Sequence, residues 1–350
     1  MVLFTHLKKR RISQRGAGTK YYINCSYYSE NADSIQTNTL IRNTNHVAIL
    51  KSIITDDIIP KKNKHIVVKI MRSNKSSDHE FQIGQQLYEN KLIGFIQYIC
   101  LFSCYDTTNE NNIEISAREP VAKIDTKICQ GEHNEKNLKK VLVMPYIQSG
   151  SVEDFSWNVG NVHILKNLLI QAVLALYVAY DAIGFLHGDL HIGNILCKET
   201  KRRTLVYKSQ NVGVGFTAPL VTYKPRSSVD VTDLRSVKST DDEITIKTEG
   251  YKVVIMDFEK SETRVEKNEL SNVSFWNNIY MMLQRVNTLS PNHGVRLQWE
   301  NDEIIQFVKE ARKRKYPCER EHVIKLQEMM NKSVFEFFEV REYKYDPDDV

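Results

Sequence analysis

The residues with the clearest chemical potential lie in two short segments of the second half of the chain. The first segment, residues 185–196, reads Phe-Leu-His-Gly-Asp-Leu-His-Ile-Gly-Asn-Ile-Leu and contains His187, Asp189 and Asn194. The second is an apolar run that ends at Asp257 and is followed by Phe-Glu. Two carboxylates and an amide at the ends of strands or loops can hold Mg²⁺ and orient a hydroxyl group. Phosphoryl transfer requires little more of a protein than such positioning and the neutralisation of charge.

Two kinds of pattern surround these segments and must position them. Apolar runs in the first part of the chain are short and β-rich, with one helical pattern among them, whereas apolar residues after Gly150 recur at helical spacing. The predicted strands are 21–23, 46–54, 65–71, 95–105 and 141–146, and the predicted helices are 78–90, 161–184, 276–285, 303–314 and 320–338. We therefore expect an α+β fold, with a sheet-rich lobe over residues 1–144 and a helix-rich lobe over residues 145–350. A ligand between the two lobes is the default expectation.

Three stretches interrupt these patterns. Residues 29–45 and 106–140 carry Asn, Thr, Glu and Lys but little to bury, so we interpret them as insertions in the sheet-rich lobe. Residues 198–252 mix short β-like runs with polar turns and lie between the two chemically interesting segments. We interpret them as an insertion in the helix-rich lobe.

The spacing of His187, Asp189 and Asn194, with Asp257-Phe-Glu after it, resembles the catalytic loop and the metal-binding turn of the protein-kinase-like superfamily. The resemblance implies a bilobal fold, in which an antiparallel sheet with one helix precedes a mostly helical lobe. It also implies that Asp189 accepts or orients the proton of a substrate hydroxyl. Asn194 and Asp257 would bind Mg²⁺, or Mn²⁺ in its place. His187 is expected to pack and hold the loop rather than to act as a base.

Other segments resemble the same family in the same order. Residues 65–71, His-Ile-Val-Val-Lys-Ile-Met, resemble the strand that carries the nucleotide-binding lysine, here Lys69, and Glu80 on the following helix would form an ion pair with it. Residues 141–147 resemble the strand and hinge that grip adenine, with Met144 lining the back of the base pocket. The nucleotide-contacting residues implied by the resemblance are Gly16, Gly18, Val67, Lys69, Met144, Tyr146, Asn194, Leu196 and Asp257.

The phosphate-covering loop of the family has a reduced counterpart near the start of the chain. Gly16 and Gly18 match two of the three glycines of that loop, and Tyr21 stands at the third position. Backbone N–H groups of such a loop would cover the phosphates, and glycine would avoid a clash of Cβ with them. This placement requires the first insertion to extend over residues 29–64. The alternative is a flexible basic N-terminus.

Several positions depart from the usual protein-kinase pattern. Gly188 replaces the arginine that precedes the catalytic aspartate, and Glu259 replaces the glycine of D-F-G. His191 stands where Ser/Thr kinases carry a lysine that neutralises the transferred phosphate, so it could donate to the γ-phosphate or be an exposed loop residue. No A-P-E sequence follows, and only 16 residues separate Glu259 from Trp276.

These departures leave more than one branch of the superfamily open. The His-Gly-Asp-Leu-His loop also resembles aminoglycoside and choline phosphotransferases. The insertion at 198–252, the helix from Trp276 and the Asn/Lys/Ile-rich composition resemble instead the Ser/Thr protein kinases of nucleocytoplasmic large DNA viruses, over roughly residues 69–283. We therefore expect a divergent viral Ser/Thr protein kinase that uses ATP and Mg²⁺ and takes a protein with Ser or Thr hydroxyls as its partner. The alternatives are a small-molecule phosphotransferase and a non-catalytic scaffold, and the presence of every expected polar residue argues against the scaffold.

Composition excludes several other classes. The chain has 350 residues, a formal net charge of +5, 41% hydrophobic and 26% charged residues, which excludes collagen, coiled-coil and wholly disordered proteins. Basic clusters at 8–11, 201–203 and 312–315 lack interleaved aromatic residues, so no nucleic-acid partner is expected. The apolar stretch 165–186 contains polar residues and is interpreted as a buried core helix, so no membrane contact is expected either.

Cysteine content and the N-terminal sequence bear on the compartment. Six cysteines are too sparse for a disulfide scaffold, and Cys100 and Cys104 are expected to be buried free thiols rather than metal ligands. The apolar stretch before Lys8 is too short for a signal peptide. We therefore expect a reducing compartment: the cytoplasm, which the viral resemblance would make that of a host cell, or a virion. The oligomeric state stays open.

Overall fold

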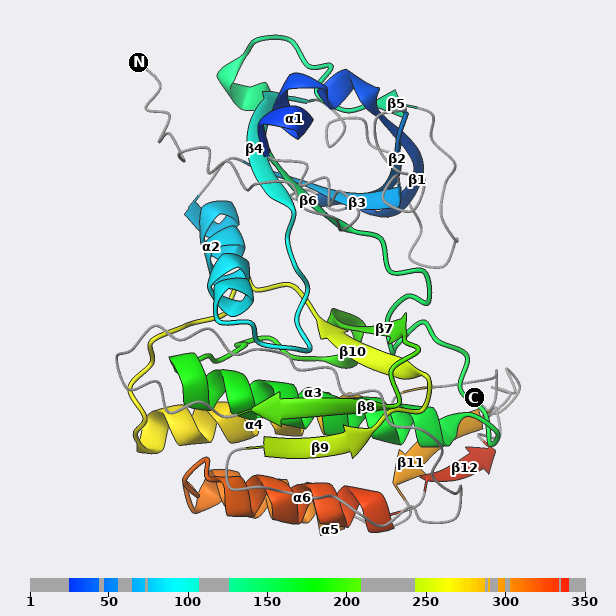
Figure 1. The fold of residues 1–350 in the computed structure, drawn as a ribbon, viewed down its shortest axis with the longest axis vertical. Helices are drawn as coiled ribbons and strands as arrows, with labels where there is room; N and C mark the ends of the chain where they lie inside the picture. Colours follow the sequence, from blue (N-terminus) through cyan, green and yellow to red (C-terminus); the bar gives the residue numbers. More distant parts are fainter. Residues whose placement is uncertain are drawn as a thin grey trace, which may run out of the picture.

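The computed structural model describes residues 25–43, 47–55, 65–72, 75–106, 126–208, 243–286, 289, 295–299, 303–333 and 335–339. The fold is of the α+β class. An antiparallel sheet that curls on itself comes first along the chain, together with α1 (Cys25–Glu30) and α2 (Lys75–Glu89), and the longer run of helices follows in the C-terminal part (Figure 1). The predicted order, a sheet-rich part followed by a helix-rich part, is confirmed.

Within the described residues, the N-terminal sheet has six strands in the order β4-β6-β3-β2-β1-β5, all antiparallel to their neighbours. Their bounds are β1 (Ile35–Asn43), β2 (Val47–Ile54), β3 (His65–Arg72), β4 (Cys100–Tyr105), β5 (Thr126–Lys127) and β6 (Leu138–Pro145). Side chains alternate between the two faces of a strand. Val68 of β3 accordingly enters the cluster inside the curled sheet, whereas Val67 and Met71 enter the main core. Lys69 shares the face of Val67.

The first predicted insertion contains part of the sheet. Residues 29–64 include β1 and β2, which form the strands immediately before β3. Buried residues alternate with partly exposed ones along the whole of β2, the pattern of a strand with one face on the core. Residues 44–46 connect β1 to β2. Gly16 and Gly18, which are predicted to form the phosphate-covering loop, come before both strands in the sequence and lie outside the described residues.

The prediction of free thiols at Cys100 and Cys104 is wrong. Cys104 at the end of β4 forms a disulfide with Cys129, 25 residues along the chain, and Cys100 is disulfide-bonded too. Pairing of β5 with β1 at the edge of the sheet anchors the chain just before Cys129. Cys129 lies within the polar stretch 106–140, where no sequence pattern indicates that the chain comes back to the sheet. Cys197 and Cys318 are free thiols.

The centre of the C-terminal part is α3 (Val162–Ile183), which is buried along most of its length. It ends at Gly184, whose left-handed backbone (φ 62°) is the usual glycine cap of a helix. By length and hydropathy alone α3 could cross a membrane, but 72% of its most apolar window is buried inside the protein. The prediction of a core helix at this position is confirmed.

Further helices and three small sheets surround α3 (Figure 1). The helices are α4 (Glu269–Val286), α5 (Glu303–Lys313) and α6 (Arg320–Lys332), and the sheets pair β7 (Ile195–Glu199) with β10 (Tyr251–Ile255), β8 (Thr204–Lys208) with β9 (Glu243–Lys247), and β11 (Val295–Trp299) with β12 (Phe335–Glu339). Leu205, Tyr207 and Ile246 of β8 and β9 are buried in the main core. The described part of the insertion predicted at 198–252 therefore contributes to the core.

Three helix boundaries differ from prediction. The helix expected over 276–285 is α4, which begins seven residues earlier, at Glu269. The helix expected over 78–90 is α2 (Lys75–Glu89), which begins one turn earlier. The helix expected over 320–338 stops at Lys332, because Ser333 turns to extended backbone (φ −71°, ψ 150°) and the next residues pair with β11 as β12. Aromatic residues favour strands when a partner strand is present. The partner β11 is distant in the sequence, so the helical spacing of residues 320–338 alone could not indicate it.

Candidate active site

A lysine and two carboxylates meet between the sheet and the helical part. β3 carries Lys69 on the face toward the main core, and α2 carries Glu80. Lys69 Nζ donates to Glu80 Oε2 at 2.9 Å and to Asp257 Oδ1 at 2.8 Å. Lys69 is 6% exposed and Glu80 is 1% exposed. The predicted ion pair between Lys69 and Glu80 is therefore present, and Asp257 joins it.

Burial and attraction compete at this triad. Burial alone would lower the pKa of Lys69, but attraction to Glu80 and Asp257 outweighs it and raises that pKa above its usual value. Burial raises the pKa of Glu80, against the opposing effect of Lys69. Lys69 therefore keeps its positive charge at neutral pH. A buried charge is stable only when its partners are complete, so the loss of one partner is costly.

The second oxygen of Glu80 is satisfied by a residue that the sequence patterns do not single out. Tyr98 Oη donates to Glu80 Oε1 at 2.7 Å, and Tyr98 is buried. Burial and the nearby carboxylate raise the pKa of Tyr98, which keeps the phenol protonated as a donor. Gly84, one turn after Glu80 on α2, makes room for the ring, because a Cβ there would lie 2.4 Å from Tyr98 Cδ2. A glycine inside a helix was the available signal for this contact.

His187 holds the loop that precedes Asp189. Its Nε2–H donates to the carbonyl of Met256 at 3.0 Å, and its Nδ1 accepts the Asp189 N–H at 3.4 Å. The side chain is fully buried, and burial lowers the pKa of His187 to about 4. A neutral imidazole locked between two backbone groups positions the loop.

Backbone contacts bring Asp189, Asn194 and Asp257 together. Asn194 Nδ2 donates to the Asp189 carbonyl at 3.1 Å, and the Met256 N–H donates to the Asn194 carbonyl at 3.0 Å. Asp257 has a left-handed backbone (φ 69°), a conformation that is strained for a residue with a side chain and that recurs at functional sites.

The side chains of Asn194 and Asp257 suit a hard cation that also binds oxygen atoms of a ligand. Among the described residues, no group of three or more His, Cys, Asp or Glu side chains is arranged to hold a metal ion. Mg²⁺ in nucleotide sites usually takes only one or two protein carboxylates and fills its other positions with phosphate oxygens and water. The amide of Asn194 and the carboxylate of Asp257 fit that requirement.

The ring of Phe258 anchors the turn after Asp257. Phe258 is fully buried, and its ring centroid lies 5.5 Å from that of Tyr98, 5.9 Å from that of His187 and 6.0 Å from that of Phe185. The same aromatic cluster therefore contacts the loop that begins at His187 and Tyr98, the hydrogen-bond partner of Glu80. The buried ion pair of Lys69 and Glu80 and the loop of His187 are therefore held by the same packed aromatic rings.

The apolar residues predicted to enclose a nucleotide base all belong to the main core or border it. Val67 and Met144 are register partners in β3 and β6, and both are buried. Leu196 of β7 and Tyr146, after β6, are partly buried and pack against the same cluster. Gly16 and Gly18, predicted to cover the phosphates, lie outside the described residues.

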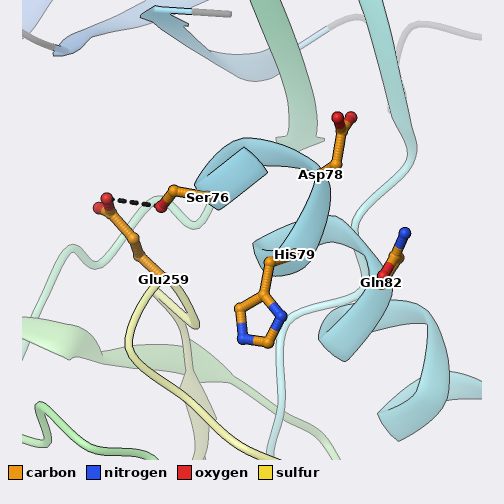
Figure 2. Close-up of a pocket in the computed structure, with 5 residues that line it drawn as sticks. All are labelled: Ser76, Asp78, His79, Gln82 and Glu259. Atoms are coloured by element: carbon orange, nitrogen blue, oxygen red, sulfur yellow. Dashed lines mark hydrogen bonds between the residues drawn. The ribbon is translucent and has the colours of Figure 1, made fainter. Parts of the chain in front are cut away.

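The segment after Phe258 is tied to α2. Ser76 Oγ donates to Glu259 Oε1 at 2.7 Å, as Figure 2 shows, and His79 Nε2 donates to the Ser261 carbonyl at 2.7 Å. Further along, Thr263 Oγ1 donates to Gln86 Oε1 at 2.7 Å. The residues drawn in Figure 2, namely Ser76, Asp78, His79, Gln82 and Glu259, line an open pocket of about 520 Å³. The pocket is therefore lined by α2 on one side and by Glu259 on the other, beside the hydrogen bond that joins them.

Two further side chains lie next to Asp189. His191 Nδ1 accepts the Gly193 N–H at 3.1 Å, so the imidazole caps the 3₁₀ turn Ile192–Asn194. Lys260, which the sequence patterns do not single out, places its Nζ 2.8 Å from Asp189 Oδ2.

Comparison of the sequence with protein-family models and with curated proteins finds no match. The geometry of these side chains therefore carries the functional assignment.

Proposed function

We propose that this chain is an ATP- and Mg²⁺-dependent phosphotransferase with a bilobal protein-kinase-like fold, and that its acceptor is a Ser or Thr hydroxyl of a protein. The observation that carries the proposal is the contact of Lys69 with both Glu80 and Asp257, at 2.9 and 2.8 Å. It joins the sheet, α2 and the turn after β10 at one point. A buried cation is thereby held where the phosphates of a nucleotide would lie.

Each group has a role in the proposed reaction. Lys69 would contact the nucleotide phosphates, and Asp189 would orient the acceptor hydroxyl and take its proton. Asn194 and Asp257 would hold Mg²⁺, which supplies charge neutralisation at the phosphate oxygens. The Asp189 side chain is 44% exposed, which suits a group that must meet an acceptor from solution. His187 keeps the loop in place and is not required to move a proton.

A small-molecule acceptor is the second candidate, and one observation favours it. α4 begins at Glu269, so only a short segment follows Glu259 before the next helix. Part of that segment pairs with the catalytic loop, where the Leu186 N–H donates to the Glu262 carbonyl at 2.9 Å. Little chain is left to form a platform for an extended peptide. An acceptor as small as an aminoglycoside or choline would need no such platform.

The test uses purified protein, γ-labelled ATP and Mg²⁺ with a panel of acceptors. Casein-like and basic proteins are offered beside aminoglycosides and choline. Asp189→Asn is the inactive variant, and Asp181→Asn is the matched control, because Asp181 is also ion-paired with a lysine but lies on α3. We expect label on Ser or Thr of a protein, lost in Asp189→Asn and kept in Asp181→Asn.

Other outcomes would redirect the assignment. Label on a small molecule would support the second candidate. Nucleotide binding without transfer to any acceptor would support a non-catalytic scaffold. Transfer at the wild-type rate by Asp189→Asn would refute the role given to Asp189, provided that circular dichroism shows the variant to be folded.

A further inference from the structure

The segment after Phe258 lies directly on the catalytic loop. The Leu186 and Glu262 backbones exchange two hydrogen bonds, at 2.9 and 2.8 Å, and Ser261 Oγ donates to the His187 carbonyl at 2.9 Å. These contacts are made by residues close in sequence to Asp189 and Lys260, so they fix the position of Lys260 relative to Asp189.

Gly188 permits this close approach. It has a left-handed backbone (φ 76°), and a Cβ at this position would lie 2.2 Å from the carbonyl oxygen of Lys260. Any side chain here would push the two segments apart. The absence of a side chain at residue 188 therefore allows Lys260 Nζ to reach Asp189 Oδ2 at 2.8 Å.

The contact between Lys260 and Asp189 has little value as a structural bond. The Lys260 side chain is 64% exposed and that of Asp189 is 44% exposed. Exposed ion pairs contribute little to stability, because water screens the charges and two side chains lose freedom. Such a pair also separates easily when a ligand arrives. The pair is better explained by what Lys260 can offer to a ligand at Asp189.

Two other basic side chains near the site have partners that hold them in place. Lys69 donates to Glu80 and Asp257. His191 accepts a backbone N–H through Nδ1 and caps a turn. A transferred phosphoryl group at Asp189 would need positive charge beside it, and Lys260 presents an exposed ammonium at that place.

We propose that Lys260 is a catalytic residue that contacts the phosphoryl group during transfer; this rests on the proposed function. The acceptor oxygen forms a bond to the γ-phosphorus, and the bond between that phosphorus and the bridging oxygen breaks, leaving its electron pair on ADP. The acceptor proton passes to the Asp189 carboxylate. Lys260 stays protonated and offsets the negative charge on the equatorial oxygens. The positive charge beside the phosphoryl group is thus supplied by Lys260, in the segment after Asp257. His191 caps the 3₁₀ turn instead.

The test compares wild type with Lys260→Met, Lys260→Arg and the control Lys267→Met. Lys267 is an exposed lysine of the same segment, but its partner is Asp181. We expect Lys260→Met to lower kcat by about 10²–10³-fold, the usual loss when one group that stabilises transition-state charge is removed. The KM for ATP should stay within about threefold, because the contact forms mainly in the transition state. Lys260→Arg should keep kcat within about tenfold of wild type, because the charge remains, and Lys267→Met should match wild type.

A second measurement does not depend on turnover. ADP with aluminium fluoride mimics the transferred group, so Lys260→Met should bind it at least about tenfold more weakly while binding Mg²⁺·ADP as wild type does. An equal loss for both ligands would overturn the proposal, because it would mean that the site itself is damaged. An unchanged kcat would also overturn it, and so would a raised kcat, which would make Lys260 a block on Asp189.

Failure of the proposed function would be recognised separately. If wild type binds both ligands but transfers no phosphate, the phosphotransferase assignment falls, and the difference between the two ligands in Lys260→Met still decides whether Lys260 contacts the phosphoryl group. If wild type binds neither ligand, both proposals fall.

Discussion

Removal of the Tyr98 hydroxyl tests whether the buried triad depends on a complete set of partners. In Tyr98→Phe the ring keeps its place over Gly84, but Glu80 Oε1 loses a donor at 2.7 Å in a position that is 1% exposed. A hydrogen bond to a charged group contributes about 1.5–3 kcal/mol. With a urea dependence of about 3 kcal/mol per molar, the unfolding midpoint should fall by roughly 0.5–1 M. Tryptophan fluorescence during urea titration provides the measurement.

Tyr207→Phe is the matched control, since it makes the same chemical change at another buried tyrosine. Tyr207 is 1% exposed, and its hydroxyl has no hydrogen-bond partner within the described part of the chain. Removal of a buried, unpaired hydroxyl should leave stability unchanged or raise it by about 1 kcal/mol. The unfolding midpoint should therefore fall in Tyr98→Phe and stay the same or rise in Tyr207→Phe. If Tyr98→Phe is as stable as Tyr207→Phe, the reasoning about the triad is refuted.

Two further predictions concern the loop that contains His187 and Gly188. Because the pKa of His187 is lowered from 6.5 to about 4, the unfolded chain gains a proton before the folded one as pH falls, so the free energy of unfolding should drop by on the order of 3 kcal/mol between those pH values. His187→Gln should flatten that slope in urea titrations at several pH values, and parallel slopes for both proteins would contradict the assignment. Gly188→Ala should cost at least about 1–2 kcal/mol more than Gly250→Ala. Both glycines have left-handed backbones, but a Cβ at Gly250 meets nothing within 4 Å; equal losses in thermal or urea unfolding would disprove the close contact at residue 188.

The resemblance of short motifs predicts those parts of the site that lie on regular elements or within one short loop. Lys69 follows the alternation of β3, and Glu80 stands on the next helix, so strand and helix geometry together bring them close. Asp189 and Asn194 belong to one short loop, which limits how far apart they can be. The helix around residues 161–184 is evident from its apolar residues alone.

Contacts between distant segments could not be predicted in the same way. Tyr98 reaches Glu80 across a turn and a loop, and only the glycine inside α2 hints at a ring beside it. The disulfide of Cys104 with Cys129 depends on how the chain returns to the sheet edge, which no local pattern encodes. The strand β12 could not be predicted because its partner β11 lies far away in the sequence, 36 residues earlier even for the nearest pair, Trp299 with Phe335.

The bonds between α2 and the segment after Phe258 have a consequence for control. Glu259, Ser261 and Thr263 each take part in one hydrogen bond to α2, the helix that carries Glu80. A swing of α2 that parted Glu80 from Lys69 would break all three, at a cost of about 1 kcal/mol each. By itself that cost would leave the parted state in roughly one molecule in a hundred. Under the proposed function, such an enzyme would be on from the moment it folds. The timing of its action would be set by when it is made and by when it meets its acceptor.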